Sequence, residues 1–347
     1  MTPTSLKVLT TVRVGTRGST LALTQTQTIA DRLAALTGLE VELVRIRTDG
    51  DVRTGSLAQL GGTGVFVTAL RDALLEGRCD VAVHSLKDLP VAPAPGLRLV
   101  SPERENPRDV LCSRTGAGLF ALPDGARVGT GSPRRAAQLL AARPDLDVVD
   151  IRGNIDTRLG RVHPGTGDLD AVVLARAGLA RIGRLDAVAE AFEPGVMLPA
   201  PGQGALAVEV RGLGAEPGPL DVALHKALDA LADRETTLSV TAERAFLARL
   251  EAGCAAPLGA LAHLETTPSS ADQDGAAFAE TGGEGFEELV LEAVAVTVDG
   301  RTAERRTARL QAAGGDDGIT LDDATRLGTQ LADEIAAAMP DVVGTGR

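Results

Sequence analysis

One short segment of the chain gathers side chains that can move protons or bind anions. Residues 81–90 read Val-Ala-Val-His-Ser-Leu-Lys-Asp-Leu-Pro, so a polar cluster directly follows an apolar strand. In open α/β sheets, ligands bind beyond the carboxyl ends of the strands, where these polar side chains would lie. Asp88 beside Lys87 can stay ionised and still exchange a proton or stabilise a developing cation. A capped turn with a surface ion pair is an equally good interpretation, and His84 taken alone favours a hydrogen-bonded structural role.

Three predicted strand-to-helix junctions share a second pattern. In each, a strand ends, a small residue lets the chain turn, and an arginine stands near the start of a helix. The junctions are residues 15–19 (Gly-Thr-Arg-Gly-Ser), 129–135 (Gly-Thr-Gly-Ser-Pro-Arg-Arg) and 152–154 (Arg-Gly-Asn). Helix N-termini and the planar guanidinium fork both suit carboxylates or phosphates. Repetition within one chain favours an anion-binding site, although ordinary turn chemistry explains any single junction.

Charge is distributed unevenly along the chain. The net charge is −12, yet residues 127–184 hold ten Arg, no Lys and six Asp, an excess of four positive charges. The acidic total and the absence of Trp and Tyr argue against general nucleic-acid binding. The basic middle indicates instead a site for an anionic small molecule, although a general preference for Arg over Lys explains part of it.

Cys254 follows a predicted long helix and stands between Gly253 and a loop that ends at Pro257. Its small neighbours leave the sulfur approachable, as a nucleophile or an attachment point requires. An ordinary loop cysteine remains the commoner interpretation. Cys79 and Cys112 lie beside apolar residues and are predicted to be small core side chains. Three scattered cysteines match no metal spacing and argue against a disulfide framework.

The elements that must position these residues alternate between short strands and helices, which is typical of α/β layers. Strands are expected at 12–14, 39–46, 80–83, 127–129, 147–151, 171–174, 205–210 and 289–298. Helices are expected after Ser19 to about residue 36, at 67–75, from about 134, after residues 152–154, at 236–249 and at 322–339. The Pro- and Gly-rich residues 198–204 predict a hinge, and the polar residues 265–285 predict a mobile surface loop.

Cellular location is inferred from what the sequence lacks. No apolar run approaches the roughly 20 residues needed to span a bilayer, and the first residues lack the pattern of a secretory signal. A cytoplasmic protein is therefore expected. No apolar helix stripe is left over for an interface, so a monomer is expected too.

Together these motifs resemble those of the hydroxymethylbilane synthase (porphobilinogen deaminase) family. The matching segments follow one order along nearly the whole chain: 16–19, 61–66, 83–90, 105–109, 129–135, 152–154, 157–159, 177–179, 201–205, 241–244 and 253–254. The resemblance implies two α/β domains like those of two-lobed periplasmic binding proteins, and a smaller C-terminal α/β domain that carries the cofactor cysteine. The implied limits are 1–105 with 203–228 for domain 1, 106–202 for domain 2 and 229–347 for domain 3.

The resemblance also implies an enzyme, a transferase of porphyrin and haem biosynthesis. Such an enzyme joins four porphobilinogen molecules head to tail, releases ammonia at each step, and frees the linear tetrapyrrole hydroxymethylbilane by hydrolysis. The growing chain is held by a dipyrromethane cofactor, attached to Cys254 through a thioether. No metal, nucleic acid or membrane partner is implied.

Individual roles follow from the same resemblance. Asp88 matches the catalytic acid, expected to bridge pyrrole nitrogens, protonate the leaving amino group and stabilise an azafulvene-like cation. The residues expected to bind the acetate and propionate groups of substrate and cofactor are Arg17, Ser19, Ser85, Lys87, Ser132, Arg134, Arg135, Arg152, Arg158 and Arg181.

A lid over the site is expected around residues 61–64, from Gln59, Thr63 and Phe66. Family members often have Lys at the first two positions, so here the lid is expected to act mainly as a cover, with Phe66 packing beneath it. The missing cations keep open the alternative of a family member without activity. A solute-binding protein of the same architecture is the other alternative, which Cys254 in a third domain argues against.

Overall fold

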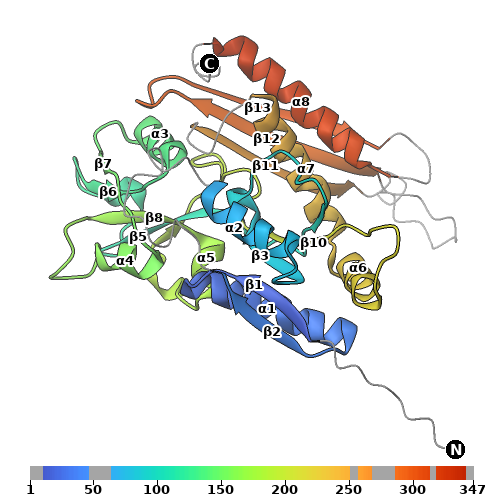
Figure 1. Ribbon diagram of the computed structural model, residues 1–347. Coiled ribbons are helices and arrows are strands. Elements are labelled where there is room, and N and C mark those ends of the chain that lie inside the picture. The colour runs from blue at the N-terminus through green and yellow to red at the C-terminus, as the bar shows by residue number, and fades with distance from the viewer. Residues whose placement is uncertain (1–10, 47–63, 251–256, 268–285, 313–317, 341–347) are drawn as a thin grey trace, which may run out of the picture. The chain divides into compact units, whose positions relative to one another are not determined.

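The computed structural model describes residues 11–46, 64–250, 257–267, 286–312 and 318–340 (Figure 1). The chain forms two compact units, each of which is described by itself. Unit 1 comprises Met1–Glu105, Ala180–Arg184 and Gly204–Asp233, and unit 2 comprises Asn106–Leu179, Leu185–Gln203 and Arg234–Arg347. Within the described ranges, no helix combines the length and the apolar character that crossing a bilayer demands.

Unit 1 is built on a five-stranded sheet of order β2-β1-β3-β10-β4. Its strands are β1 (Val12–Thr16), β2 (Val41–Arg45), β3 (Val81–Ser85), β4 (Leu97–Val100) and β10 (Leu206–Arg211). The first three run parallel, whereas β10 runs antiparallel to both β3 and β4. The parallel strands therefore end at one edge of the sheet, where β3 delivers the polar segment that follows it.

Helices cover both faces of this sheet. They are α1 (Thr20–Thr37), α2 (Gly64–Leu75) and α6 (Pro219–Leu231). Because successive strand residues point to opposite faces, Val81 and Val83 pack with α1 and α6, whereas Ala82 packs with α2. His84 shares the face of Ala82, and Ser85 shares the face of Val83. The two faces of β3 therefore meet side chains from different helices.

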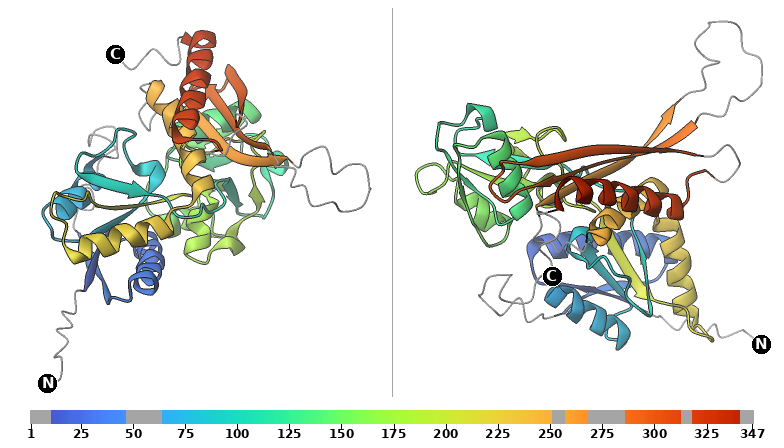
Figure 2. Two further views of the ribbon diagram at one scale, coloured as in Figure 1. Left: turned by 90° about the vertical axis from the view of Figure 1, so that its right-hand side faces the viewer. Right: turned by 90° about the horizontal axis from the view of Figure 1, so that it is seen from above.

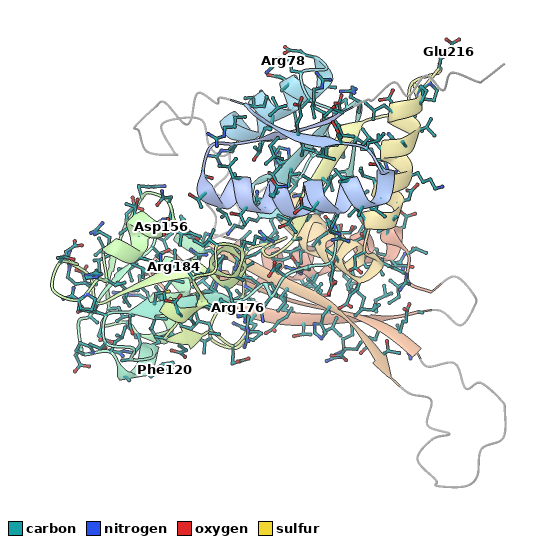
Figure 3. The ribbon with its side chains drawn as sticks, turned by 90° about the horizontal axis from the view of Figure 1, so that it is seen from below. Arg78, Phe120, Asp156, Arg176, Arg184 and Glu216 are labelled. Carbon is teal, nitrogen blue, oxygen red and sulfur yellow. The ribbon has the colours of Figure 1, made fainter. Side chains whose placement is uncertain are left out.

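Unit 2 repeats this architecture in its first part, with the sheet order β7-β6-β8-β5-β9. The strands are β5 (Asp109–Ser113), β6 (Arg127–Gly129), β7 (Asp147–Val149), β8 (Ala171–Ala175) and β9 (Glu190–Ala191). The helices are α3 (Pro133–Ala142), α4 (Ile155–Gly160) and α5 (Arg176–Arg181). Again three strands run parallel and one, β5, is antiparallel to its neighbour β8. Figure 3 shows Phe120, whose exposed side chain lies on the short turn before β6.

The C-terminal part of unit 2 contains a three-stranded antiparallel sheet. Its strands are β11 (Leu258–Thr267), β12 (Phe286–Val296) and β13 (Ala303–Gln311). Two helices, α7 (Arg234–Arg249) and α8 (Leu321–Ala338), lie along one face of it (Figure 2). Their shared core includes Phe246, Leu291 and Leu331, each fully buried. This layer has its own hydrophobic core, as an α/β unit of its own requires.

The predicted α/β fold with a smaller C-terminal α/β part is confirmed, with differences at single elements. Five strands (β4, β5, β9, β11 and β13) and two helices (α5 and α6) were not predicted. Strand β13 is largely exposed, so its sequence shows little apolar alternation. Residues 265–267 were predicted to be loop but belong to β11, because they pair with residues 286–288 of β12. The rest of that predicted loop, 268–285, lies outside the described residues.

One close approach fixes how α8 packs on α7. A Cβ added at Gly328 would collide with the carbonyl oxygen of Ala242 and lie 2.9 Å from Phe246 N. We expect Gly328→Ala to lower the free energy of unfolding by about 1–3 kcal/mol, because the backbone there cannot give way. Thermal unfolding measures the loss. Gly160→Ala, in a helix with nothing within 4 Å of the added Cβ, is the control; an equal effect of both substitutions would contradict the packing argument.

Candidate functional site

The polar segment after β3 lies at the edge where the parallel strands of unit 1 end. It continues as a single 3-10 turn, Leu86–Asp88, whose Leu86 is buried while Asp88 is exposed. Leu86 N–H donates to Ala205 O at 3.0 Å, and Leu89 N–H donates to Leu86 O at 3.0 Å. Buried Leu86 and Leu89 thus hold the turn inward and leave the Asp88 carboxyl facing solvent, where a substrate can reach it.

One face of this strand end opens onto a hollow of about 340 Å³ within unit 1. The Ser85 hydroxyl donates to Gln25 Oε1 at 3.3 Å, and Gln25 lines the hollow together with Arg181. Arg181 Nη2 donates to Gly204 O at 2.6 Å. Burial lowers the pKa of Arg181, and the carboxylate of Glu105 works in the opposite direction. The structure therefore places Arg181 in the lining of the hollow, and Ser85 beside it through its hydrogen bond to Gln25.

The other face of the strand end holds a buried ion-pair cluster. Glu209 on β10 is 1% exposed, and Arg71 of α2 donates to it from Nη2 at 2.6 Å and from Nε at 3.1 Å. His84 Nε2 lies 3.2 Å from Glu209 Oε2. Burial opposes ionisation of this carboxyl, but the interactions with His84 and Arg71 outweigh it and lower its pKa to about 2. His84 is buried beside this carboxylate, and its structural role stays a prediction.

The first junction of unit 1 uses its serine as a helix cap. Ser19 is the N-cap of α1, and its Oγ accepts from Ala22 N–H at 3.3 Å. Thr16 is buried and hydrogen-bonded to Thr26 at 2.8 Å, so the turn before the helix is fixed. Arg17 stands between these two anchors and is half-buried. The local geometry presents Arg17 on a rigid turn.

In unit 2, two of the predicted arginines share one carboxylate of the chain itself. Arg135 donates to Asp109 Oδ1 from Nε at 3.0 Å and from Nη2 at 2.7 Å. Arg134 Nη2 lies 2.8 Å from Asp109 Oδ2. All three residues are at most 5% exposed. Asp109 therefore orients both guanidinium groups and compensates only one of their two charges.

The predicted hinge segment is tied to the same carboxylate. Gln203 Nε2 donates to Asp109 Oδ1 at 2.8 Å and to Pro107 O at 2.7 Å. One residue earlier, Gly202 N–H donates to the buried carboxylate of Glu243 at 2.6 Å. Glu243 also accepts from Ala262 N–H of β11 at 2.8 Å. Up to Gln203 the segment is thus held firmly within unit 2.

Arg152 and Arg158 add positive charge near this pair. Arg158 Nε donates to Gly153 O at 2.9 Å, and Arg152 Nη2 donates to Asp150 at 3.3 Å. Burial and the neighbouring charges of Arg135 and Arg152 lower the pKa of Arg158, while Asp150 raises it. Burial lowers the pKa of Arg134 as well, and Arg135 adds to that effect against Asp109. The positive charges of these guanidinium groups repel one another, so a bound anion would reduce that repulsion.

Ser132 caps α3, with its Oγ accepting from Arg135 N–H at 3.5 Å. Its hydroxyl thus lies beside the arginines of the same junction. The predictions for Cys254, Gln59 and Thr63 fall outside the described residues, as does the side chain of Phe66. Cys79 and Cys112 are buried, as predicted.

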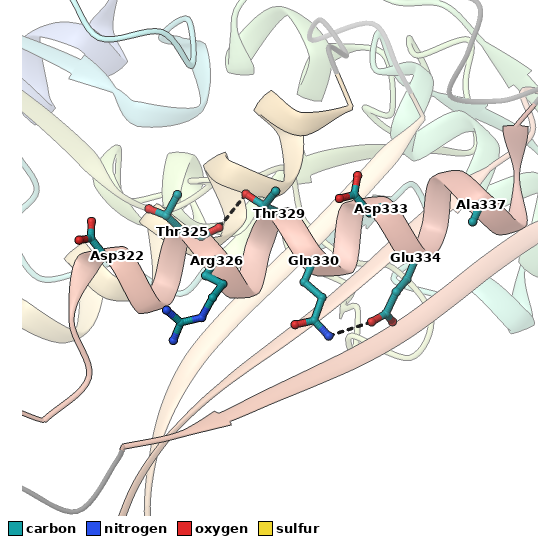
Figure 4. A pocket seen from close by; sticks show the side chains of 8 residues that line it. All are labelled: Asp322, Thr325, Arg326, Thr329, Gln330, Asp333, Glu334 and Ala337. Atoms are coloured by element: carbon teal, nitrogen blue, oxygen red, sulfur yellow. Dashed lines mark hydrogen bonds between the residues drawn. The ribbon is translucent and has the colours of Figure 1, made fainter.

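A second hollow, of about 790 Å³, runs along the outer side of α8 (Figure 4). Several of its polar groups are engaged within the helix: Thr329 Oγ1 donates to Thr325 O at 2.8 Å, and Gln330 Nε2 donates to Glu334 Oε1 at 3.1 Å. Asp333 accepts from Arg249 of α7 at 2.7 Å. None of the residues predicted to do chemistry lines it. Size alone therefore does not make it the functional site.

Sequence reasoning missed the carboxylates that organise both clusters, Asp109 and Glu209. Asp109 stood in a matching motif, residues 105–109, but no role was predicted for it. The signal available was a single acidic residue at the start of an apolar strand, in a region of excess arginine. Glu209 gave a comparable signal, as one carboxylate within the apolar run of β10.

Comparison with known proteins finds similarity over most of the chain. The family model for the porphobilinogen deaminase dipyrromethane cofactor-binding domain matches residues 12–216, and the model for the C-terminal domain of that family matches residues 237–337. The chain therefore belongs to the porphobilinogen deaminase family.

Relatives and structural neighbours are similar to different degrees. A porphobilinogen deaminase of Leifsonia xyli is 60% identical over 255 residues, covering 73% of this chain and 76% of the relative. Those of Micrococcus luteus and Thermobifida fusca are 51% and 50% identical, covering 86% and 94% of this chain and 82% and 93% of their own. A solved structure of the BenM effector-binding domain with benzoate has a TM-score of 0.36 at 17% identity, covering 63% of this chain and 90% of its own.

The lowered pKa of Glu209 makes a prediction for stability against pH. Because its value of about 2 lies below the ordinary 4.5, ionised Glu209 stabilises the fold above about pH 4.5, and this contribution is lost as the pH falls towards 2. We expect the Tm of Glu209→Gln to fall less steeply than that of the parent across this window. Glu216→Gln, at an exposed carboxylate (Figure 3), is the control. Parallel curves for Glu209→Gln and the parent would contradict the assignment.

Proposed function

We propose that this chain is a hydroxymethylbilane synthase that condenses four porphobilinogen molecules head to tail, with release of ammonia, and hydrolyses the product to hydroxymethylbilane. The observation that carries the proposal is the crowding of guanidinium groups in unit 2. Arg134, Arg135 and Arg158 are partly or fully buried near one another, with lowered pKa for Arg134 and Arg158. Such a cluster suits a ligand with several carboxylates, and each pyrrole unit brings an acetate and a propionate.

The same cluster fits the dipyrromethane cofactor of the family. Arg134 and Arg135, oriented by Asp109, would hold its carboxylates, with Ser132 beside them and Arg152 and Arg158 adding charge. When bound, the cofactor supplies the pyrrole carbon to which the first substrate is joined. We assign its attachment to Cys254, through a thioether.

In unit 1, Asp88 is the proposed catalytic residue. Its exposed carboxyl stands on a turn that buried Leu86 and Leu89 hold in place. There it would hold the pyrrole N–H groups, give a proton to the leaving amino group, and stabilise the positive charge that develops as ammonia departs. In the same unit, Arg17, Ser19, Ser85 and Lys87 would hold substrate side chains, and Arg181 would bind a carboxylate at the hollow that it lines with Gln25.

Further parts of the proposal concern the whole chain. We propose three domains with the limits 1–105 with 203–228, 106–202 and 229–347. The independent core under α7 and α8 supports the third. We propose a monomer in the cytoplasm that binds neither nucleic acid nor membranes, in line with its net charge of −12. Gln59, Thr63 and Phe66 would form a cover rather than a cationic lid.

The cofactor assignment is tested by the mass of the intact protein. We expect purified protein to exceed its sequence mass by two linked pyrrole units, and Cys254→Ser to lack this excess and to lose turnover, because the thioether cannot form. Cys112→Ala is the control, at a buried cysteine, and should keep the excess. Near-parent turnover of Cys254→Ser would overturn the attachment to Cys254. An unmodified parent would overturn the assignment as well, and would favour a solute-binding protein or an inactive relative.

The catalytic assignment is tested by Asp88→Asn. The exposed side chain carries little of the fold, so we expect an unchanged Tm and an unchanged excess mass if the protein is loaded with cofactor before assay. Turnover of porphobilinogen should fall by about 10²–10⁴-fold, the usual contribution of a positioned acid. Release of product, followed as the oxidised porphyrin, is the measurement. Full turnover in this variant would reassign the acid.

A further inference from the structure

The end of β3 is fixed by side chains from both faces of its sheet. On one face the Ser85 hydroxyl binds Gln25 of α1 at 3.3 Å. On the other, His84 Nε2 lies 3.2 Å from Glu209, which Arg71 of α2 holds through two guanidinium nitrogens. Adjacent residues of one strand are thus tied to different helices, immediately before the turn that carries Asp88.

Backbone pairing alone does not hold this turn. The antiparallel ladder between β3 and β10 ends at the pair Ser85 and Leu206. Beyond it, Leu86 N–H donates to Ala205 O and links the turn to the returning chain. The direction in which residues 86–88 leave the sheet therefore depends on how firmly the last residues of the strand are anchored.

The cluster around Glu209 lies beside apolar side chains. Leu70, Leu74 and Ala82 on the same side of the sheet form a hydrophobic core. A carboxylate that is 1% exposed costs free energy to bury, and apolar side chains of similar volume often stabilise as well as a buried ion pair. Apolar packing does not fix the orientation of a side chain. The bidentate contact of Arg71, in contrast, holds Glu209 in one orientation.

We propose that Glu209 is a positioning residue for the reaction: held by Arg71, it fixes His84 and with it the turn that presents Asp88. The inference rests on the proposed function, in which Asp88 is the catalytic acid. His84 precedes Asp88 by four residues, so a shift of the imidazole and its backbone moves the carboxyl. A misplacement of about 1 Å at a reacting group costs up to about 100-fold in rate.

The opposite end of the same strand provides a matched control. Asp80, which directly precedes β3, is 2% exposed and also faces two cationic side chains. Arg13 Nη2 lies 2.8 Å from its carboxylate and Arg211 Nη2 lies 3.1 Å from it. Asp80 and Glu209 are thus buried carboxylates of similar environment, but Glu209 is the one beside the end of β3 that carries Asp88.

The experiment compares Glu209→Gln with Asp80→Asn, each a neutral replacement of nearly equal volume, in cofactor-loaded full-length protein. We expect both to lower the Tm. Glu209→Gln should in addition lower kcat for porphobilinogen by about 10- to 100-fold with KM within about twofold of the parent. Asp80→Asn should keep kcat within about twofold. Arg71→Lys, which keeps the charge but loses the bidentate contact, should lower kcat less than Glu209→Gln does.

A double substitution separates positioning from general loss of stability. If Glu209 acts through Asp88, Glu209→Gln should change the rate little once Asp88 is already Asn, measured as the first enzyme-bound intermediate by intact mass over hours. Equal loss of kcat in Glu209→Gln and Asp80→Asn, or additive losses in the double variant, would overturn the inference. If Glu209→Gln does not fold, the kcat of Arg71→Lys decides, and a parent-like value would overturn it too. Full turnover of Asp88→Asn would instead refute the proposed function itself.

Discussion

The shared carboxylate of Asp109 is the interaction on which the arrangement of unit 2 depends. It accepts from Arg135 and Gln203 and lies 2.8 Å from Arg134, so helix α3 and the segment before Gly204 meet at one fully buried group. Removing one partner from a buried ion pair is costly, because the remaining charge is left without compensation. Since one carboxylate serves two guanidinium groups, the cluster is both rigid and still positive, which is what recognition of a polyanion requires.

Both units place the side chains proposed to react or bind at the same part of a sheet. Parallel strands end at a common edge, and the residues that follow them leave the sheet together. In unit 1 this edge carries the turn with Asp88, and in unit 2 it carries the junctions with Arg134 and Arg152. The two five-stranded sheets have corresponding orders, and in each one strand, β10 or β5, runs antiparallel to both of its neighbours. The chemistry differs because the loops differ while the scaffold stays alike.

Local features of the site were predictable from the sequence, and distant ones were not. Ser19 and Ser132 were expected at helix starts and do cap α1 and α3, because capping depends on neighbours within a few residues. The partners of Glu209 and Asp109 lie 138 and 26 residues away in the chain, so only the fold brings them together. Strand β13 escaped prediction for another reason: its side chains are mostly exposed, so no apolar alternation marks it.

The late entry of β10 into the first sheet has a consequence for synthesis of the chain. Strand β3 is complete at Ser85, but the neighbour that pairs with it comes from Leu206–Arg211, after β5 to β9 have been made. A chain emerging from the ribosome therefore carries β3 with one unpaired edge until residue 211 has appeared. Until then His84 and Arg71 lack their carboxylate, and an exposed strand edge invites association with other chains. The N-terminal sheet thus becomes native only when more than half of the protein has been translated.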